Sequence, residues 1–137
     1  MENYLQDDIE RAKGGQYMKL TNQEITIYAQ DLSTFSIDIK LPVRINFFLQ
    51  KNIQTIITAF QEIETAKLGI GKEYGQLEDN GASYRIPPEN MEIVQSELND
   101  LFSLEQELPI HIFKLDDFDG IELTYQQMSA IMFMVEE

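Results

Sequence analysis

The chain has 137 residues, 43% of them hydrophobic, so it is long enough to bury a core within one domain and too apolar to be disordered. The absence of cysteine excludes disulfides, a thiol nucleophile and thiolate-bound metal. The formal charge is −14, and residues 73–137 carry 15 acidic against two basic residues, which disfavours direct binding of this half to DNA or RNA. No apolar run is long enough to span a membrane and no signal peptide is recognisable, so we expect a cytoplasmic protein with no membrane contact.

Residues 1–17 raise the question of where translation begins. The codons for residues 13–15, Lys-Gly-Gly, can read AAAGGAGG, the complement of the end of bacterial ribosomal RNA, and two codons separate them from Met18. We therefore expect translation to start at Met18, residues 1–17 to be an upstream extension with little part in the fold, and the gene to be bacterial or from a bacteriophage. The alternative is a short helix over residues 3–13 that the two glycines end.

The first well-marked helix is predicted from Thr21 to Phe35. Thr21 and Glu24 match a capping box, in which each side chain accepts a backbone N–H of the other residue. Apolar residues follow at helical spacing: Ile25, Tyr28, Leu32 and Phe35. The alternating residues 37–42 then predict a short strand that ends at Pro42, which also suits the first turn of the next helix.

The longest helix is predicted to follow Pro42 and to fray before Gly75. Steps of three and four residues draw an apolar seam along it: Leu49, Ile53, Ile56, Phe60 and Ile63. Gly69 and Gly71 are expected to weaken or bend its last turns.

A second helix should pack back against this seam. Asn80-Gly81 and two prolines predict a compact turn, after which helical periodicity returns at Met91, Val94, Leu98 and Leu101. Two apolar-faced helices joined by a turn predict an antiparallel hairpin. In that hairpin we expect Ile56 and Phe60 to face Val94 and Leu98.

The last third of the chain predicts a strand and a helix. Residues 107–115 alternate, with Ile110 and Ile112 on one face and His111 and Phe113 on the other. Thr124 and Gln127 match a second capping box, and an apolar stripe follows it: Met128, Ile131, Met132 and Val135.

The predicted fold class is α+β and predominantly α. We expect an antiparallel hairpin of long helices, a small antiparallel β-sheet and a C-terminal helix, all in one globular domain over residues 18–137.

Few residues suggest catalysis or metal binding. His111 is the only histidine, and no cysteine can help it to complete a zinc site, so we expect a structural histidine in a strand with an ordinary hydrogen bond. The run that contains Asp117, Asp119 and Gly120 resembles an EF-hand loop, but leucine and glutamine stand at the first and last ligand positions. We expect a solvated loop in which Gly120 supplies an unusual backbone angle. The sequence predicts no catalytic residue, cofactor or metal site.

Two groups of residues could instead bind a partner protein. Met128, Met132 and Met134 could form an adaptable binding surface or belong to the core. A possible acidic partner surface comprises Glu89, Glu92, Glu97, Asp100, Glu105, Glu107, Asp116, Asp117 and Asp119. The first four of these acids are expected on the outer face of the helix whose periodicity begins at Met91. The alternative is that the acidity only keeps the protein soluble.

Four stretches carry a resemblance over residues 18–137: MKLTNQEI at the start, LPVRINFFLQKNI at the long helix, YGQLEDNG at the turn and IELTYQQMSAIMFMVEE at the end. In this order they resemble small acidic proteins of bacteriophages and prophages of Gram-positive bacteria, a domain family of unknown function. The resemblance implies a phage context, often near tail and lysis genes, and it supplies no catalytic residues.

We therefore expect a non-enzymatic protein-interaction protein, such as an accessory or adaptor protein in virion or tail assembly, with a phage structural protein as its partner. The alternative is an acidic anti-defence inhibitor that imitates nucleic acid and binds a host defence protein. An enzyme is the third class and has the least support. The oligomeric state stays open.

Overall fold

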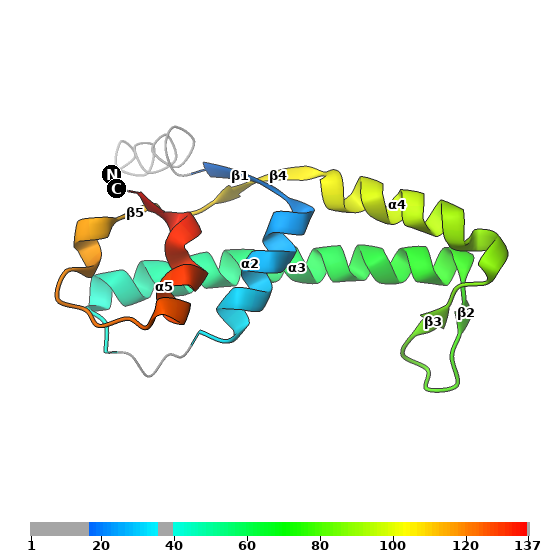
Figure 1. Ribbon diagram of the computed structural model, residues 1–137, viewed down its shortest axis with the longest axis horizontal. Coiled ribbons are helices and arrows are strands. Elements are labelled where there is room, and N and C mark those ends of the chain that lie inside the picture. Colours follow the sequence, from blue (N-terminus) through cyan, green and yellow to red (C-terminus); the bar gives the residue numbers. More distant parts are fainter. Residues whose placement is uncertain (1–16, 36–39, 137) are drawn as a thin grey trace, which may run out of the picture.

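The structure is a computed structural model that describes residues 17–35 and 40–136. It is elongated, and helix α3 (Val43–Tyr74) runs along most of its length (Figure 1). We call residues 64–103 the arm and the other described residues the head, because every buried residue of the main core lies in the head. The predicted fold class, α+β and predominantly α, is confirmed.

Strand β1 (Tyr17–Thr21) leads directly into helix α2 (Asn22–Ser33). The predicted capping box is present: Thr21 Oγ1 accepts the N–H of Glu24 at 3.0 Å, and Glu24 Oε1 accepts the N–H of Thr21 at 2.9 Å. The buried face of α2 consists of Asn22, Ile25, Ala29 and Leu32. Of the predicted apolar face, Ile25 and Leu32 are buried in the core, whereas Tyr28 and Phe35 are half-buried against it, and Phe35 lies after the end of the helix.

Two predictions fall wholly or partly outside the described residues. The possible helix over residues 3–13 lies outside them, and the upstream role of residues 1–17 stays a prediction. Of the strand predicted over residues 37–42, only residues 40–42 are described, and these do not form a strand.

Helix α3 begins one residue after Pro42, which is its N-cap rather than part of its first turn. Its buried stripe consists of Ile45, Leu49, Asn52, Ile56, Ala59 and Ile63. Three residues of the predicted seam belong to this stripe, whereas Ile53 and Phe60 lie beside it and are half-buried. The difference arises because Asn52 and Ala59 occupy the centre of the stripe, and a pattern of large apolar residues does not count them.

The helix continues through Gly69 and Gly71 and ends at Tyr74, so the predicted end is confirmed and the predicted weakening is not seen. Gly71 lies against Tyr84, and a Cβ at this position would be 3.3 Å from the Tyr84 Cβ. The glycine therefore allows the chain that follows α3 to pack closely on the helix.

The predicted turn is a β-hairpin of β2 (Gln76–Leu77) and β3 (Tyr84–Arg85), which projects from the end of α3 (Figure 1). Gly81 has a φ of 71°, a conformation that suits glycine at the tip of such a turn. A short 3₁₀ helix, η1 (Pro88–Asn90), then leads into helix α4 (Met91–Ser103).

Helices α3 and α4 form the predicted antiparallel hairpin, and three contacts fix its register. Asn90 Nδ2 donates to the Tyr74 carbonyl at 2.8 Å, and the Tyr74 hydroxyl bonds Glu97 Oε1 at 3.0 Å. Lys67 Nζ lies 5.9 Å from the centre of the Phe102 ring. The 13 residues of α4 thus pack beside the last turns of α3.

This register makes the predicted pairing of Ile56 and Phe60 with Val94 and Leu98 wrong. Ile56 and Phe60 pack in the head, because α4 starts at the end of α3 and is much shorter than it. Met91, placed on the apolar face by its spacing, is 56% exposed.

In the described part of the chain the strands form three separate pairs. Strand β4 (Glu105–Pro109) pairs antiparallel with β1, with Tyr17 opposite Pro109 and Thr21 opposite Glu105. Strand β5 (Phe113–Lys114) pairs with β6 (Val135–Glu136) in parallel, so the predicted antiparallel arrangement is wrong for this pair. A parallel pair needs a long connection, and here residues 115–134 supply it.

The single strand predicted over residues 107–115 is interrupted. Residues 110–112 do not belong to a strand, and Ile110 and Phe113 are both fully buried, so their side chains do not alternate between two faces. The break occurs where Asn52 bonds the backbone of His111: its Oδ1 accepts the N–H at 2.8 Å and its Nδ2 donates to the carbonyl at 2.9 Å.

The C-terminal segment contains η2 (Leu115–Phe118), α5 (Tyr125–Ile131) and η3 (Met132–Met134). The predicted capping box of α5 is confirmed, with the Gln127 N–H 3.1 Å from Thr124 Oγ1. The helix is shorter than predicted, and the 3₁₀ turn after Ile131 buries Met134 and leaves Met132 exposed.

Candidate functional site

His111 is the only histidine, and its ring contacts aromatic rings. It stacks on Phe48 with ring centres 4.1 Å apart and meets Phe113 edge-on. Burial lowers the pKa of His111 from its ordinary 6.5 and Arg44 lowers it further, whereas Asp117 acts in the opposite direction. The stacked ring fits a structural role, but His111 does not lie in the predicted strand, and the hydrogen bonds seen in the described residues are made by its backbone to Asn52 rather than by its ring.

The acidic run after β5 forms a turn that its own side chains hold. Asp117 Oδ2 accepts the N–H of Lys114 at 2.9 Å, so Asp117 caps the 3₁₀ helix η2. Gly120 has a φ of 78°, as its predicted role requires. Among the residues that the structure describes, no three His, Cys, Asp or Glu side chains are grouped as metal ligands.

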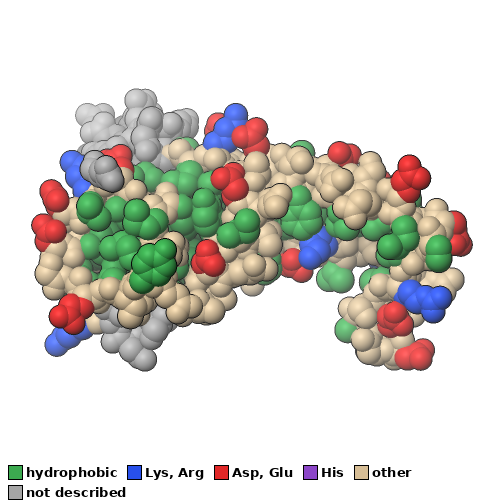
Figure 2. All heavy atoms as spheres, in the orientation of Figure 1, with side chains coloured by type: hydrophobic (Ala, Val, Ile, Leu, Met, Phe, Trp, Pro, Cys, Tyr) green, Lys and Arg blue, Asp and Glu red, His purple; other side chains and the backbone are tan. Residues whose placement is uncertain are grey.

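The nine acids proposed as a partner surface fall into three places. Glu89, Glu92 and Asp100 are exposed on the arm, and Glu105 and Glu107 are exposed on β4. Asp116, Asp117 and Asp119 lie at the opposite end of the long axis from α4. Figure 2 shows the acidic side chains scattered over the visible face rather than gathered in one patch.

Glu97 does not lie on the outer face of α4, where the sequence places it. Its carboxylate bonds the Tyr74 hydroxyl across the arm, and this bond is the main reason why the pKa of Tyr74 is raised. The prediction was wrong because periodicity alone does not show on which side of a helix the partner helix packs.

The arm exposes apolar residues and buries almost none. Val94 is the only buried residue of the arm. Leu68, Leu77, Met91 and Ile93 are between 44% and 58% exposed. Figure 2 shows hydrophobic side chains along the arm, between acidic ones. The head also exposes apolar residues, and two of them, Val43 and Phe47, line one groove on α3. The head differs from the arm in that it contains the main buried core.

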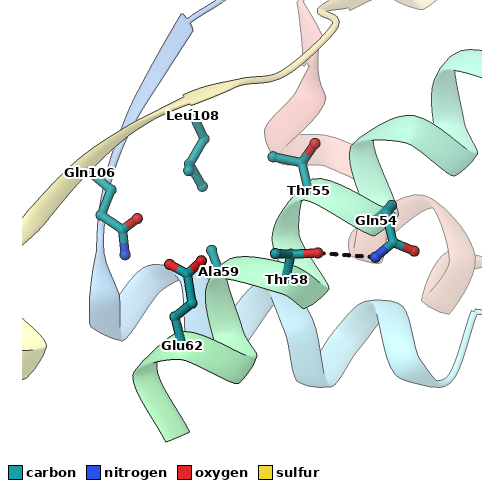
Figure 3. Close-up of a pocket in the computed structure, with 7 residues that line it drawn as sticks. All are labelled: Gln54, Thr55, Thr58, Ala59, Glu62, Gln106 and Leu108. Carbon is teal, nitrogen blue, oxygen red and sulfur yellow. Dashed lines mark hydrogen bonds between the residues drawn. The ribbon is translucent and has the colours of Figure 1, made fainter. Parts of the chain in front are cut away.

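A groove of about 300 Å³ runs between α3 and β4 (Figure 3). Its lining residues are Gln54, Thr55, Thr58, Ala59, Glu62, Gln106 and Leu108. Gln54 donates to Thr58 Oγ1 at 3.0 Å, and Gln106 donates to Asn22 Oδ1 at 2.7 Å. With one carboxylate, two hydroxyls and two carboxamides, the lining can form hydrogen bonds but offers no nucleophile paired with a base.

The groove residues and Asn52 were not found by sequence reasoning. Asn52 had a visible signal, because it is a polar residue at a core position of an apolar helix stripe. Glu62 and Gln106 carry no such signal in the sequence, because the groove depends on how α3 and β4 lie relative to each other in space.

The described helices contain no segment that is both long and apolar enough to cross a membrane. Comparison with models of known families, with curated proteins and with solved structures finds no match.

Proposed function

We propose that this chain is a non-enzymatic protein-interaction protein that binds a protein partner through its arm. The observation that carries the proposal is that the arm buries only Val94 while it exposes Leu68, Leu77, Met91 and Ile93. Two helices alone cannot cover both of their apolar faces, and a further layer is the usual solution. A partner that packs on the arm would supply this layer.

The chemistry of the arm favours a partner with apolar anchors and a basic rim. The arm carries eight acidic and three basic residues. In protein interfaces a few buried apolar anchors supply most of the affinity, whereas charges at the rim mainly set the association rate and the choice of partner. We therefore assign the affinity to the exposed apolar residues rather than to the acids.

We place this interaction in the cytoplasm of a bacterial host and in a phage or prophage setting, because the order of sequence features resembles such proteins. An accessory or adaptor role in virion or tail assembly fits a small protein with an exposed arm. The acidic anti-defence inhibitor remains the alternative, and the dispersal of the nine acids over three places gives it less support.

The test compares two triple variants. The arm variant carries Leu68→Gln, Met91→Gln and Ile93→Gln, and the control variant carries Val43→Gln, Phe47→Gln and Tyr125→Gln at exposed apolar positions of the head. Each immobilised chain is exposed to lysate of infected Gram-positive cells, and the retained proteins are quantified. We expect a protein that the unchanged chain and the control variant retain and that the arm variant loses.

Retention of the same proteins in the same amounts by all three chains would contradict the proposal. Melting temperatures of the three chains must agree within a few degrees, because surface substitutions away from special features usually change stability by less than about 0.5 kcal/mol.

A further inference from the structure

Strand β4 has one edge that no strand in the described part of the chain occupies. It pairs with β1 on one side only. The Asn22 N–H bonds the Leu104 carbonyl at 2.8 Å, and this position continues the β1–β4 register. Because the pattern alternates, Gln106 and Leu108 direct their backbone groups toward β1. The backbone groups of Glu105 and Glu107 therefore point to the other edge.

The groove described above lies beside β4, between helix α3 and the β4 residues Gln106 and Leu108 that face it. Figure 3 shows the side chains of Gln106 and Leu108 directed from β4 toward α3. Strand β4 has five residues, which corresponds to about 16 Å of edge. Pro109 has no N–H to donate, and proline within sheets is typical of edge strands.

Just beyond this edge, Asn52 of α3 already bonds the backbone as a neighbouring strand would. Its side-chain amide bonds both the N–H and the carbonyl of His111, at 2.8 and 2.9 Å. Further back along the edge, Gln54, Thr58 and Glu62 line the groove. The hydrogen bonds from α3 to the backbone at this edge therefore stop at His111, and the groove begins beyond them.

The negative charge beside this edge favours a binding partner that carries basic side chains. Glu105 and Glu107 are exposed on the face of β4 that points away from α3, and Glu62 is exposed in the groove. Within the existing pair, Lys19 of β1 stands directly opposite Glu107. Opposite charges at facing positions stabilise a strand pair.

We propose that the free edge of β4 accepts an extended segment of a partner protein as a third strand, with Lys or Arg at alternate positions opposite Glu105 and Glu107. Main-chain bonds would supply the affinity and the alternating cations the specificity, as in other cases of strand addition. This site lies outside the arm, so the two proposals can fail separately.

The probe is a capped nine-residue peptide of alternating Lys and Thr, used with the full chain. Hydrogen exchange measured by NMR should show slower exchange of the Glu105 and Glu107 amides on binding, and unchanged exchange of the Gln106 and Leu108 amides. Two further peptides are N-methylated, one only at its Lys residues and the other only at its Thr residues. Each keeps all of its side chains and loses every second backbone N–H donor. One of the two should lose roughly tenfold or more in affinity and the other should bind nearly as the parent does.

Two protein variants separate the backbone from the charge. Glu107→Pro removes both the outward N–H and the charge, whereas Glu107→Gln removes only the charge. We expect the proline variant to bind the peptide at least several-fold more weakly than the glutamine variant does. A matched peptide with Glu in place of Lys should bind neither the unchanged chain nor the variants.

Three results would overturn the proposal. The first is equal weakening by the two N-methylated peptides, which would show that no strand pairs with the edge. The second is binding without a change in the exchange of the Glu105 and Glu107 amides. The third is concentration-dependent protection of these amides without peptide, together with a dimer mass in sedimentation, which would make a second copy of this chain the occupant.

Discussion

The side chain of Asn52 on α3 bonds both backbone polar groups of His111, and these two residues are 59 positions apart in the sequence. Asn52 is 1% exposed, and its Nδ2 also lies 3.2 Å from the sulfur of Met134. One carboxamide thus joins the long helix to the chain between β4 and β5, and it makes a polar residue necessary at the centre of an apolar stripe.

Replacing Asn52 by alanine should therefore be costly. The substitution leaves the N–H and carbonyl of His111 without partners, and each unsatisfied buried group costs about 1–3 kcal/mol. We expect the free energy of unfolding in urea to fall by about 2–4 kcal/mol. Asn46→Ala, at an exposed position of the same helix, is the control. A loss below about 0.5 kcal/mol for Asn52→Ala would show that water replaces the side chain.

Truncation along α3 should follow the observed stripe rather than the predicted seam. Ile56 is fully buried, whereas Phe60 is half-buried beside the stripe. Ile56→Ala should cost about 2–5 kcal/mol, and Phe60→Ala should cost less although it removes more atoms. Urea unfolding of both variants checks the order of the two losses. The reverse order would place Phe60 at the centre of the core.

The start-site prediction can be tested by truncation. A chain that begins at Met18 should melt within a few degrees of the full chain, because Leu20 of β1 is buried whereas Tyr17 is 43% exposed. A chain that begins at Asn22 lacks β1 and should be strongly destabilised. Thermal unfolding followed by circular dichroism compares the three. A large loss in the chain that begins at Met18 would show that residues 1–17 contribute to the fold.

Because the pKa of His111 is lowered in the folded state, the free energy of unfolding should decrease as the pH falls. Burial favours the neutral ring in the folded state, so the unfolded chain binds the proton more readily. The contribution of His111 to stability is complete above its ordinary pKa of 6.5 and is lost as the pH falls below that value through the lowered pKa. His111→Phe keeps an aromatic ring beside Phe48 and removes the titration.

Between about pH 7 and about pH 5 the unchanged chain should lose more stability in urea unfolding than the His111→Phe variant. An NMR titration of the single histidine gives its pKa directly. Arg44→Ala should raise that pKa, because the nearby cation disfavours protonation. A pKa at or above 6.5 in the unchanged chain would contradict the expected direction.

Removal of acids from the arm separates the two proposed modes of partner binding. The variant Glu89→Gln, Glu92→Gln and Asp100→Asn loses three exposed charges and keeps Glu97, which bonds Tyr74. If apolar anchors supply the affinity, partner binding should persist, with slower association and weaker dependence on salt. Surface plasmon resonance at two salt concentrations measures both effects. Complete loss of the complex would favour imitation of nucleic acid.

Local patterns predicted the helices well and the distant contacts poorly. Both capping boxes lie within four residues, so Thr21 and Thr124 could be recognised without knowledge of the fold. The register of α4 on α3 and the break after Pro109 depend on contacts between residues far apart in the chain. A period of 3.6 residues gives the apolar face of a helix but not the level at which another helix packs against it.

For the candidate surfaces, too, local features could be predicted and contacts between distant residues could not. Exposure of most acids follows from their charge, but the inward position of Glu97 depends on Tyr74, which lies 23 residues away. The free edge of β4 could not be predicted, because it requires knowing that, among the described strands, only β1 pairs with β4 and that α3 passes nearby.

Helix α3 belongs to the head and to the arm without a break, and this continuity makes it a spacer of fixed length. Its 32 residues span about 48 Å. The groove lies near the middle of α3, at residues 54–62, and the helix ends at Tyr74. Roughly 25 Å of helix therefore separate the centre of the groove from the point where α3 ends in the arm. A partner on the arm and a strand on β4 would therefore be held at a set distance and angle. In an assembly, that geometry would let one small chain position two other proteins relative to each other.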